Sequence, residues 1–245
     1  MNEKINIYVA AHKESTFPEE KIYVPIRVGA AINENDFGYL RDDNGDNISK
    51  KNKNYCELTA IYWIWKNDKS DIVGLTHYRR YFFKKFRICK FKNVLNSEDI
   101  EKILNSYDMI VPNLTFNIKH NTRTSWNYSH KIEDYDLCRE IIRKKYPEYL
   151  DDFDKFSKSK FMYTCNMCIT KKEIFDEYCE WLFNILFELE KNVDISNYDD
   201  YNKRLFGFMS ERLFNVWVNH KKLKVKRFPV YNMARKPHNQ YIMIN

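Results

Sequence analysis

Residues 42–82 read DDNGDNISKKNKNYCELTAIYWIWKNDKSDIVGLTHYRRYF. After a polar loop, residues 55–67 carry apolar side chains at spacings of three and four, the period of one helix face: Tyr55, Leu58, Tyr62 and Trp65. The apolar run DIVGL at 71–75 predicts a buried strand, and THYRRYF follows it. This order brings a strand end close to a helix start, and open α/β sheets bind ligands outside the carboxyl ends of their strands.

Apolar runs and helical patterns alternate along the rest of the chain as well. Further strands are predicted at residues 4–11, 23–32, 107–112, 161–170 and 223–230, and further helices at residues 97–107, 131–145, 172–191 and 208–219. Residues 113–130 are loop-like. This alternation predicts an α/β fold with a mixed, mainly parallel central sheet flanked by helices. Residues 1–245 contain no repeat and no linker, so we expect a single domain.

The composition narrows the class of partner. A chain of 245 residues with 44% hydrophobic and 31% charged residues is typical of a globular protein. The net charge of +7 suggests an anionic partner, such as a nucleotide diphosphate or an anionic lipid surface. No arginine-rich arm or nucleic-acid motif is present, so nucleic acid is not an expected partner. The 16% of aromatic residues suit stacking on sugars and bases, although the codon usage of an AT-rich genome explains them equally well.

The six cysteines are predicted to be reduced. No signal peptide is read at the N-terminus, because INIYVAAH at residues 5–12 already reads as a strand, and we therefore expect a cytoplasmic location. Cys165 and Cys168 form a lone C-x-x-C in a strand-like run, where residues three apart face opposite sides. Structural cysteines are therefore favoured over a zinc site. No apolar run reaches the roughly 18–20 residues that span a bilayer, so any membrane contact is expected to be peripheral.

Several nucleotide-binding and hydrolytic motifs are absent. With only five glycines, the chain has no G-x-G-x-x-G and no P-loop, and it also lacks G-x-S-x-G and H-E-x-x-H. These absences argue against dinucleotide-binding Rossmann enzymes, P-loop kinases, α/β-hydrolases and zincins.

The first remaining candidate site is THYRRYF. His77, Arg79 and Arg80 concentrate positive charge at a strand end, and the planar guanidinium group suits a diphosphate. If the strand continues, His77 and Arg79 share one face. A basic edge of a surface strand is the alternative interpretation.

The second candidate is the loop before the helix. Its acidic residues do not have the spacing of an EF-hand. Asn47, Ser49 and Asn52 are predicted to hydrogen-bond a nucleotide at the helix N-terminus, where backbone N–H groups also favour anions. A plain polar turn around Asn44-Gly45 is the competing explanation.

The third candidate is GFMSERLFNVWV at residues 207–218. Glu211 is expected in the first turn of a helix, beside a bulky apolar face, where a carboxylate could act as a general base. A glutamate that complements the helix dipole is the alternative.

Together these segments resemble a family of bacterial glycosyltransferases for capsule, exopolysaccharide and O-antigen biosynthesis, long labelled only as a domain of unknown function. The resemblance covers nearly the whole chain, and its most specific block runs from 55 to 82. It is carried by HK, VPIRVGA, GDNIS-x-KN, YCELTAIYWIWKN, GLTHYRRYF, NMCIT, YCEWLF and GFMSERL.

This resemblance implies a cytoplasmic enzyme that transfers a hexose from a UDP-sugar, with galactose in pyranose or furanose form as the expected sugar. The implied acceptor is a lipid-linked oligosaccharide, reached by peripheral contact with the anionic inner face of the plasma membrane. The fold it implies is GT-A-like, with donor binding in roughly residues 1–112 and the acceptor and catalytic part in roughly residues 113–245.

A comparison with GT-A enzymes assigns expected roles to single residues. Where those enzymes carry a metal-binding Asp-x-Asp, this chain has His77-Tyr78-Arg79, so we expect protein cations to neutralise the diphosphate and no metal or other cofactor to be required. His12 and Lys13, at the end of the first strand, join the predicted donor site. Asn166 is expected in the sugar pocket and Glu211 as the base. Further candidates for the acceptor pocket are His130, Asp134 and Asp136.

Two other functions stay open on the sequence alone. A non-catalytic sugar- or polyanion-binding module would share the aromatic content and the positive charge. A glycoside hydrolase would need a pair of carboxylates, and no spacing in the sequence singles one out.

Overall fold

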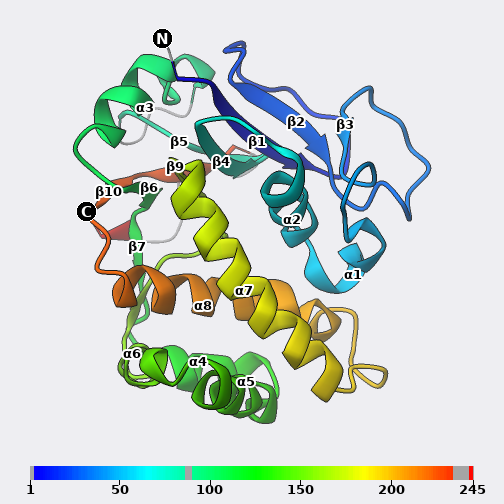
Figure 1. Cartoon of the computed structure of the whole chain (residues 1–245), viewed down its shortest axis with the longest axis vertical. Coiled ribbons are helices and arrows are strands. Elements are labelled where there is room, and N and C mark those ends of the chain that lie inside the picture. The colour runs from blue at the N-terminus through cyan, green and yellow to red at the C-terminus, as the bar shows by residue number, and fades with distance from the viewer. Residues whose placement is uncertain (1–2, 86–89, 234–242, 245) are drawn as a thin grey trace.

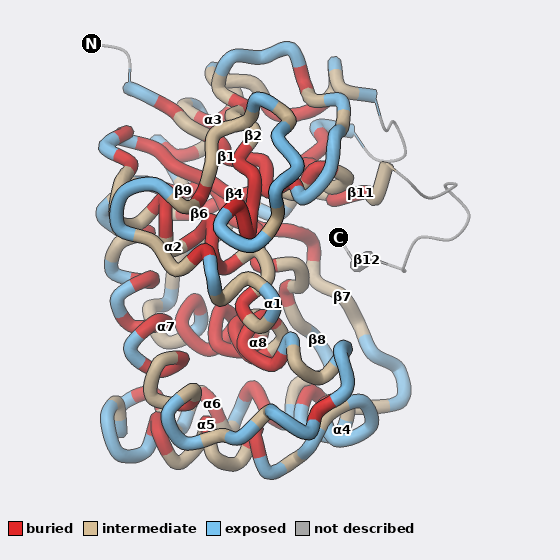
Figure 2. Tube along the Cα trace, turned by 90° about the vertical axis from the view of Figure 1, so that its right-hand side faces the viewer, coloured by how far each residue is buried: buried red, intermediate tan, exposed pale blue. Residues whose placement is uncertain are grey.

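The structure is a computed structural model, and it describes residues 3–85, 90–233 and 243–244 (Figure 1). A mixed sheet lies at one end, helices α7 and α8 pack beneath it, and helices α4, α5 and α6 form a further layer below α8 (Figures 1 and 2). Among the described residues, no helix combines the length and apolar character needed to cross a bilayer.

The main sheet has the strand order β10-β6-β9-β4-β1-β2-β3, with β5 paired to β4 and β11. Its strands are β1 Ile5–Ala11, β2 Tyr23–Arg27, β3 Leu40–Arg41, β4 Ile72–His77, β5 Arg80–Phe82, β6 Met109–Pro112, β9 Cys168–Lys171, β10 Val225–Phe228 and β11 Val230–Asn232. β1 runs parallel to β2 and β4, whereas β9 runs antiparallel between β4 and β6. The mixed, mainly parallel sheet predicted from the sequence is confirmed. A smaller sheet joins β7 Leu114–Phe116, β8 Phe161–Met162 and β12 Met243–Ile244.

Eight α-helices are described. They are α1 Asn52–Tyr55, α2 Leu58–Asn67, α3 Ser97–Leu104, α4 Thr122–Ser129, α5 Ile132–Lys145, α6 Leu150–Ser157, α7 Lys172–Asn192 and α8 Leu205–His220. Short 3₁₀ turns cover Ser49–Lys51, Phe91–Asn93, Pro147–Tyr149 and Asn202–Arg204.

Apolar side chains cover both faces of the central strands. Along β1, Tyr8 and Ala10 belong to the cluster that includes α2, α7 and α8, while Ile7 and Val9 belong to the cluster that includes α3. This two-residue alternation buries β1 on both faces, as expected for a central strand of a sheet covered by helices on both sides. The red tube at the centre of Figure 2 shows the same burial.

Two predicted elements are interrupted. The helix expected at 55–67 breaks after Tyr55, because Cys56 has φ 52°, and α2 begins only at Leu58. The strand expected at 161–170 is split into β8 and β9 by a turn in which Cys165 has φ 78° and Asn166 φ 48°. Left-handed backbone fits neither a helix nor a strand, so each break ends its element.

Three smaller expectations were wrong. THYRRYF is a hairpin rather than one strand: Tyr78 and Arg79 form the turn and His77 pairs with Arg80, so His77 and Arg79 do not share a strand face. The loop-like residues 113–130 contain β7 and α4. Helix α8 begins at the buried Leu205, which extends its apolar face by a turn, and Glu211 therefore lies in the second turn.

Candidate active site

Five chain segments meet at the carboxyl ends of β1 and β4. They are the residues after β1, the β4–β5 turn, the break between α1 and α2, the β8–β9 turn, and the start of α8. Contacts of α1 with α2 and α8, and the pairing of β1 with β4, hold these segments together. We call their titratable residues the strand-end site: His12, Lys13, Glu57, His77, Arg79, Arg80, Arg204 and Glu211.

Tyr78 lies at the centre of the basic side of this site. The His12 ring meets the Tyr78 ring edge-on, with centroids 5.1 Å apart. Arg79 Cζ lies 4.6 Å and Lys13 Nζ 5.7 Å from the same ring centroid. An aromatic face attracts cations, so this ring gathers positive charge at the end of two parallel strands.

The two histidines contribute neutral rings. Burial, reinforced by the Arg80 charge, lowers the pKa of His77 to about 3. His12 is an exposed residue, but partial desolvation of its ring lowers its pKa, and the charges of Arg79, Lys13 and Arg204 lower it further. A proton on either ring is opposed by burial and by these cations. A pKa of about 3 favours the neutral His77 ring, and a contact of His77 with a diphosphate stays a prediction.

Three arginines in this site have no carboxylate partner. Within the described ranges, the guanidinium groups of Arg79, Arg80 and Arg204 form no salt bridge. Arg79 Nε is buried without a hydrogen-bond acceptor, and Arg204 Nε donates to Cys56 Sγ at 3.2 Å. Unpaired cations gathered at one place repel one another, so the site favours an anionic ligand.

Two glutamates face these cations. Cys165 N–H donates to Glu211 Oε1 at 2.8 Å, and Asn166 Nδ2 donates to Glu57 Oε1 at 2.7 Å. Burial raises the pKa of Glu211; Arg212, 3.3 Å from its Oε2, opposes the rise, and the Glu57 charge adds to it. Burial also raises the pKa of Glu57. A carboxylate whose pKa is raised toward neutrality is suited to accept a proton during a reaction.

The model of a domain of unknown function, DUF4422, matches residues 6–222. The chain belongs to this family. The family predicted from the sequence, one labelled as a domain of unknown function, is therefore confirmed.

Comparisons with other proteins support the same fold. The apo structure of the bifunctional glycosyltransferase WbbM matches with a TM-score of 0.88 and 33% identity, over 95% of the DUF4422 chain and 46% of WbbM. The DUF4422 chain thus spans slightly less than half the length of that structure, and its GT-A-like α/β fold is confirmed. The mannosyltransferase Ktr4p from S. cerevisiae covers 92% of the chain and 69% of its own length at 10% identity, but its TM-score of 0.34 carries no argument. No curated protein matches the sequence.

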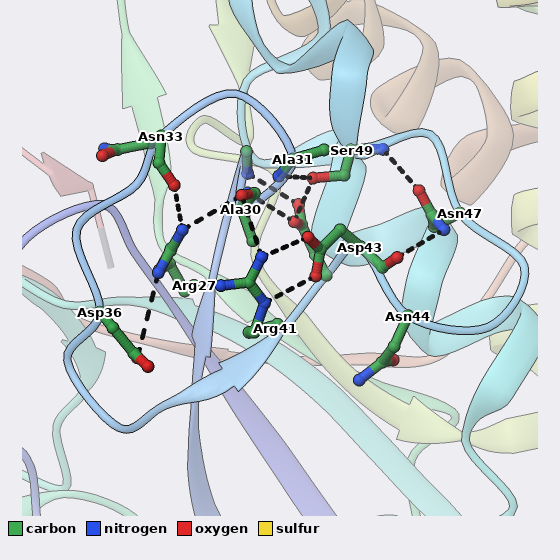
Figure 3. A network of polar contacts seen from close by, with 12 residues as sticks. Arg27, Ala30, Ala31, Asn33, Asp36, Arg41, Asp43, Asn44, Asn47 and Ser49 are labelled. Carbon is green, nitrogen blue, oxygen red and sulfur yellow. Dashed lines mark hydrogen bonds and ion pairs between the residues drawn. The ribbon is translucent and has the colours of Figure 1, made fainter.

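The loop predicted to bind the nucleotide is held by its own hydrogen bonds (Figure 3). Ser49 is buried; its hydroxyl donates to Asp42 and accepts from the N–H of Ala31. Asn47 Nδ2 donates to backbone carbonyls of the same turn. Asn52 Nδ2 donates to Cys56 O and Thr59 Oγ1. The polar-turn explanation fits these contacts better than nucleotide binding by the three side chains.

The predicted acceptor residues divide into two groups. Asp134 is buried and accepts a hydrogen bond from Tyr198, and Asp136 pairs with Arg123 on the surface. Neither aspartate contacts the strand-end site. His130 stacks on Tyr201 with centroids 5.5 Å apart and lies 4.6 Å from the Phe208 ring. We call His130, Tyr201 and Phe208 the Tyr201 ledge.

The ledge adjoins the charged site. Phe208 lies one helical turn before Glu211, so the two side chains share a face of α8. Arg204 Cζ lies 5.1 Å from the Phe208 ring, and Tyr201 is 50% exposed. An exposed ring beside a candidate base provides a stacking surface for a second ligand.

Asn166 lies in the strand-end site, between the break before α2 and the start of α8. It is 5% exposed, and its Nδ2 donates to Glu57 Oε1 and to Gly207 O at 3.2 Å. Its amide nitrogen therefore binds the protein itself, while its buried Oδ1 has no hydrogen-bond partner among the described residues, and a contact between Asn166 and a sugar stays a prediction.

Sequence reasoning missed Glu57 and Arg204. Glu57 was missed because the apolar spacing of residues 55–67 predicts one continuous helix and gives no sign of the break at Cys56. Arg204 was missed because the helix was predicted to begin at residue 208, whereas the structure places Arg204 at the end of a 3₁₀ turn and at the N-cap of α8.

Proposed function

We propose that the chain is a glycosyltransferase that moves a hexosyl group from a nucleotide-sugar donor to a glycan acceptor. One observation carries the proposal: unpaired arginines and two glutamates of raised pKa meet at the carboxyl ends of parallel strands. The 33% identity to WbbM over nearly all of this chain supports it.

Arg79 and Arg80, assisted by Lys13 and Arg204, bind the donor diphosphate in this proposal. Guanidinium groups form short, charge-assisted hydrogen bonds with phosphate oxygens. Negative charge grows on the diphosphate as the glycosidic bond breaks, so fixed cations stabilise the transition state more than the ground state. We propose UDP as the nucleotide and a mechanism that needs no divalent metal, because the β4 end carries cations where an acidic pair would bind one.

Glu211 acts as the general base. The acceptor hydroxyl oxygen forms a bond to the anomeric carbon, and its proton passes to Glu211. The bond from the anomeric carbon to the phosphate oxygen breaks, and the nucleoside diphosphate leaves with the electron pair. Burial brings the pKa of Glu211 closer to the working pH, which favours proton transfer.

The acceptor glycan stacks on the Tyr201 ledge, next to Glu211. We propose galactose as the transferred sugar and a lipid-linked oligosaccharide of capsule, exopolysaccharide or O-antigen synthesis as the acceptor. A cytoplasmic protein with net charge +7 can approach such a lipid at an anionic membrane surface.

The pair Glu57 and Glu211 also suits a glycoside hydrolase, which uses two carboxylates. The unpaired arginines favour the transferase, because hydrolysis of a neutral glycan gives them no anion to bind.

A thermal-shift screen of nucleotides and nucleotide-sugars, each with and without EDTA, tests the donor assignment. We expect UDP and UDP-galactose to raise the melting temperature by several degrees whether or not EDTA is present. Slow release of UDP from UDP-galactose then separates an enzyme from a binding module. A screen in which no nucleotide stabilises the protein would overturn the proposal, and stabilisation lost with EDTA would overturn the metal-independent mechanism.

A further inference from the structure

Adjacent residues of the β8–β9 turn each hold one glutamate of the strand-end site. The backbone N–H of Cys165 binds Glu211, while the side-chain amide of Asn166 binds Glu57. Both hydrogens of the Asn166 amide point to acceptors, Glu57 Oε1 and Gly207 O, and this fixes the orientation of the amide. The two glutamates come from different helices, so the turn is the physical link between them.

The backbone around this link is strained. Four non-glycine residues in the described part of the chain have positive φ, and Cys56, Cys165 and Asn166 are three of them. Left-handed backbone at such residues costs of order 1 kcal/mol each and persists only where surrounding contacts hold it. Cys56 immediately precedes Glu57, and the other two carry the hydrogen bonds to the glutamates. Strain is thus concentrated where the two carboxylates are positioned.

The charges around Glu211 are few. Arg212 lies beside it on α8, Arg80 faces it from β5, and Glu57 from the start of α2. Two thiols also lie close, Cys56 at the end of α1 and Cys165 in the turn. Burial raises the pKa of both thiols, that of Cys165 to about 11, so they stay neutral across the working range. Among these groups, Glu57 is then the one whose ionised form adds negative charge beside Glu211.

We propose that Glu57 is a positioning residue: through Asn166 it fixes the β8–β9 turn whose Cys165 N–H holds Glu211, and its carboxyl group is the second acidic group beside Glu211. This inference rests on the proposed role of Glu211 as the base. Glu57 itself need not touch the donor or the acceptor.

Two variants at Glu57 separate the positioning effect from the charge. In Glu57→Gln, the side-chain oxygen can still accept from Asn166, but the negative charge is gone. In Glu57→Ala, both are lost. Asn166→Gly removes the donor of the same hydrogen bond, and glycine tolerates the left-handed backbone at this position. It therefore tests the positioning effect even if Glu57→Ala fails to fold. Glu177→Gln, on the exposed side of α7 where Glu177 pairs with Lys221, is the control for loss of a charge.

The first measurement is the pH dependence of kcat/KM for UDP-galactose turnover. In Glu57→Gln the acid limb should move to lower pH, because a neighbouring negative charge no longer favours the protonated form of Glu211. Glu57→Ala and Asn166→Gly should lose about 10–100-fold in kcat with KM for UDP-galactose within about threefold of wild type. Glu177→Gln should match wild type. An unmoved acid limb in Glu57→Gln would overturn the charge effect, and full activity in Asn166→Gly would overturn the positioning.

A second measurement needs no turnover. The ¹³C-labelled side-chain carboxyl of Glu211, assigned by its loss in Glu211→Gln, is titrated by NMR in wild type and in Glu57→Gln. A titration midpoint at lower pH in Glu57→Gln supports the coupling, and identical midpoints refute it. If wild type turns over no nucleotide-sugar, the proposed function fails, while this titration still decides whether Glu57 controls Glu211.

Discussion

Two polar regions lie at the same edge of the sheet and differ in how their charges are paired. The first, the Asp42 network, is centred on the buried Asp42, which accepts hydrogen bonds from the N–H groups of Gly29 and Ala30 and from Ser49 Oγ. Arg27 donates to carbonyls of the same loop, and Arg41 pairs with Asp43. The second region, the strand-end site, holds three arginines that no carboxylate pairs within the described residues.

This difference in charge pairing indicates that the Asp42 network stabilises the fold and that the strand-end site binds a ligand. Buried polar groups that bind one another stabilise a fold, because each hydrogen bond avoids the cost of an unpaired buried group. Cations left unpaired at a strand end lower stability, and their retention is explained by a ligand of opposite charge. The polar residues of 42–82 thus serve two purposes. Asp42 and Ser49 hold a loop by hydrogen bonds, whereas Arg79 and Arg80 place positive charge at the strand ends.

The largest expected effect falls on the strand-end site. Replacing Glu211 by Gln removes the proposed base and should lower kcat for transfer by about 10³-fold, within the range of general base catalysis. UDP affinity should stay nearly unchanged, because the cations are intact. Steady-state kinetics and calorimetry measure the two quantities. Glu173→Gln, an exposed change on α7, is the matched control, and full activity of Glu211→Gln would refute the base assignment.

The second-largest effect is expected in the Asp42 network, where a substitution should lower the free energy of unfolding and leave ligand binding unchanged. Asp42→Ala leaves two backbone N–H groups and the Ser49 hydroxyl without an acceptor, which should lower the free energy of unfolding by about 3 kcal/mol. UDP affinity of the folded protein should be close to that of wild type. Glu34→Ala in the same loop, where the side chain is exposed and forms no salt bridge within the described residues, should change stability by less than about 0.5 kcal/mol. Equal losses in the two variants, measured by urea unfolding, would contradict the assignment of this network to structure.

A smaller effect is expected at the β4–β5 turn. Arg79→Ala removes one charge-assisted contact to the diphosphate and should weaken UDP-galactose binding by about 10–100-fold, while stability changes little because the guanidinium has no ion-pair partner to lose. Arg123→Ala, which breaks a surface pair with Asp136, removes the same charge far from the site and is the control. Calorimetry that shows the same affinity in Arg79→Ala and wild type would remove Arg79 from the donor site.

The fold was predictable where burial follows a clear period. β1 and α7 show their periods over many residues, and the sequence analysis found both. Helix α4 was missed because Thr122 and Trp126 are its buried residues and the remainder is polar, so no periodic apolar face is visible. The breaks at Cys56 and at Cys165-Asn166 were missed because each depends on tertiary contacts between segments far apart in the chain, such as that of Asn166 with Gly207.

The candidate site was predictable where topology alone brings residues together. His12, Lys13 and the β4–β5 turn follow parallel neighbouring strands, so their meeting follows from the strand order. Ser49 and Asn52 were misassigned because a polar loop residue looks the same in sequence whether it binds a ligand or the backbone. Glu57 could not be found, since its place in the site depends on the helix break.

The smallest expected effect links stability to pH at Glu211. The folded-state pKa of Glu211 is raised above its unfolded value by burial, so the stabilising contribution of the group is present below the unfolded pKa and is lost as pH rises through the folded pKa. Glu211→Gln removes the buried charge and should therefore raise the melting temperature, and by more at pH 8 than at pH 5. Thermal unfolding of both proteins at the two pH values measures this difference. Asp42→Asn, made in the paired region, should lower the melting temperature at both values, because Asp42 accepts hydrogen bonds that an amide satisfies less well. If Glu211→Gln is less stable than wild type at pH 8, the charge of Glu211 stabilises the fold as that of Asp42 does, and this prediction is wrong.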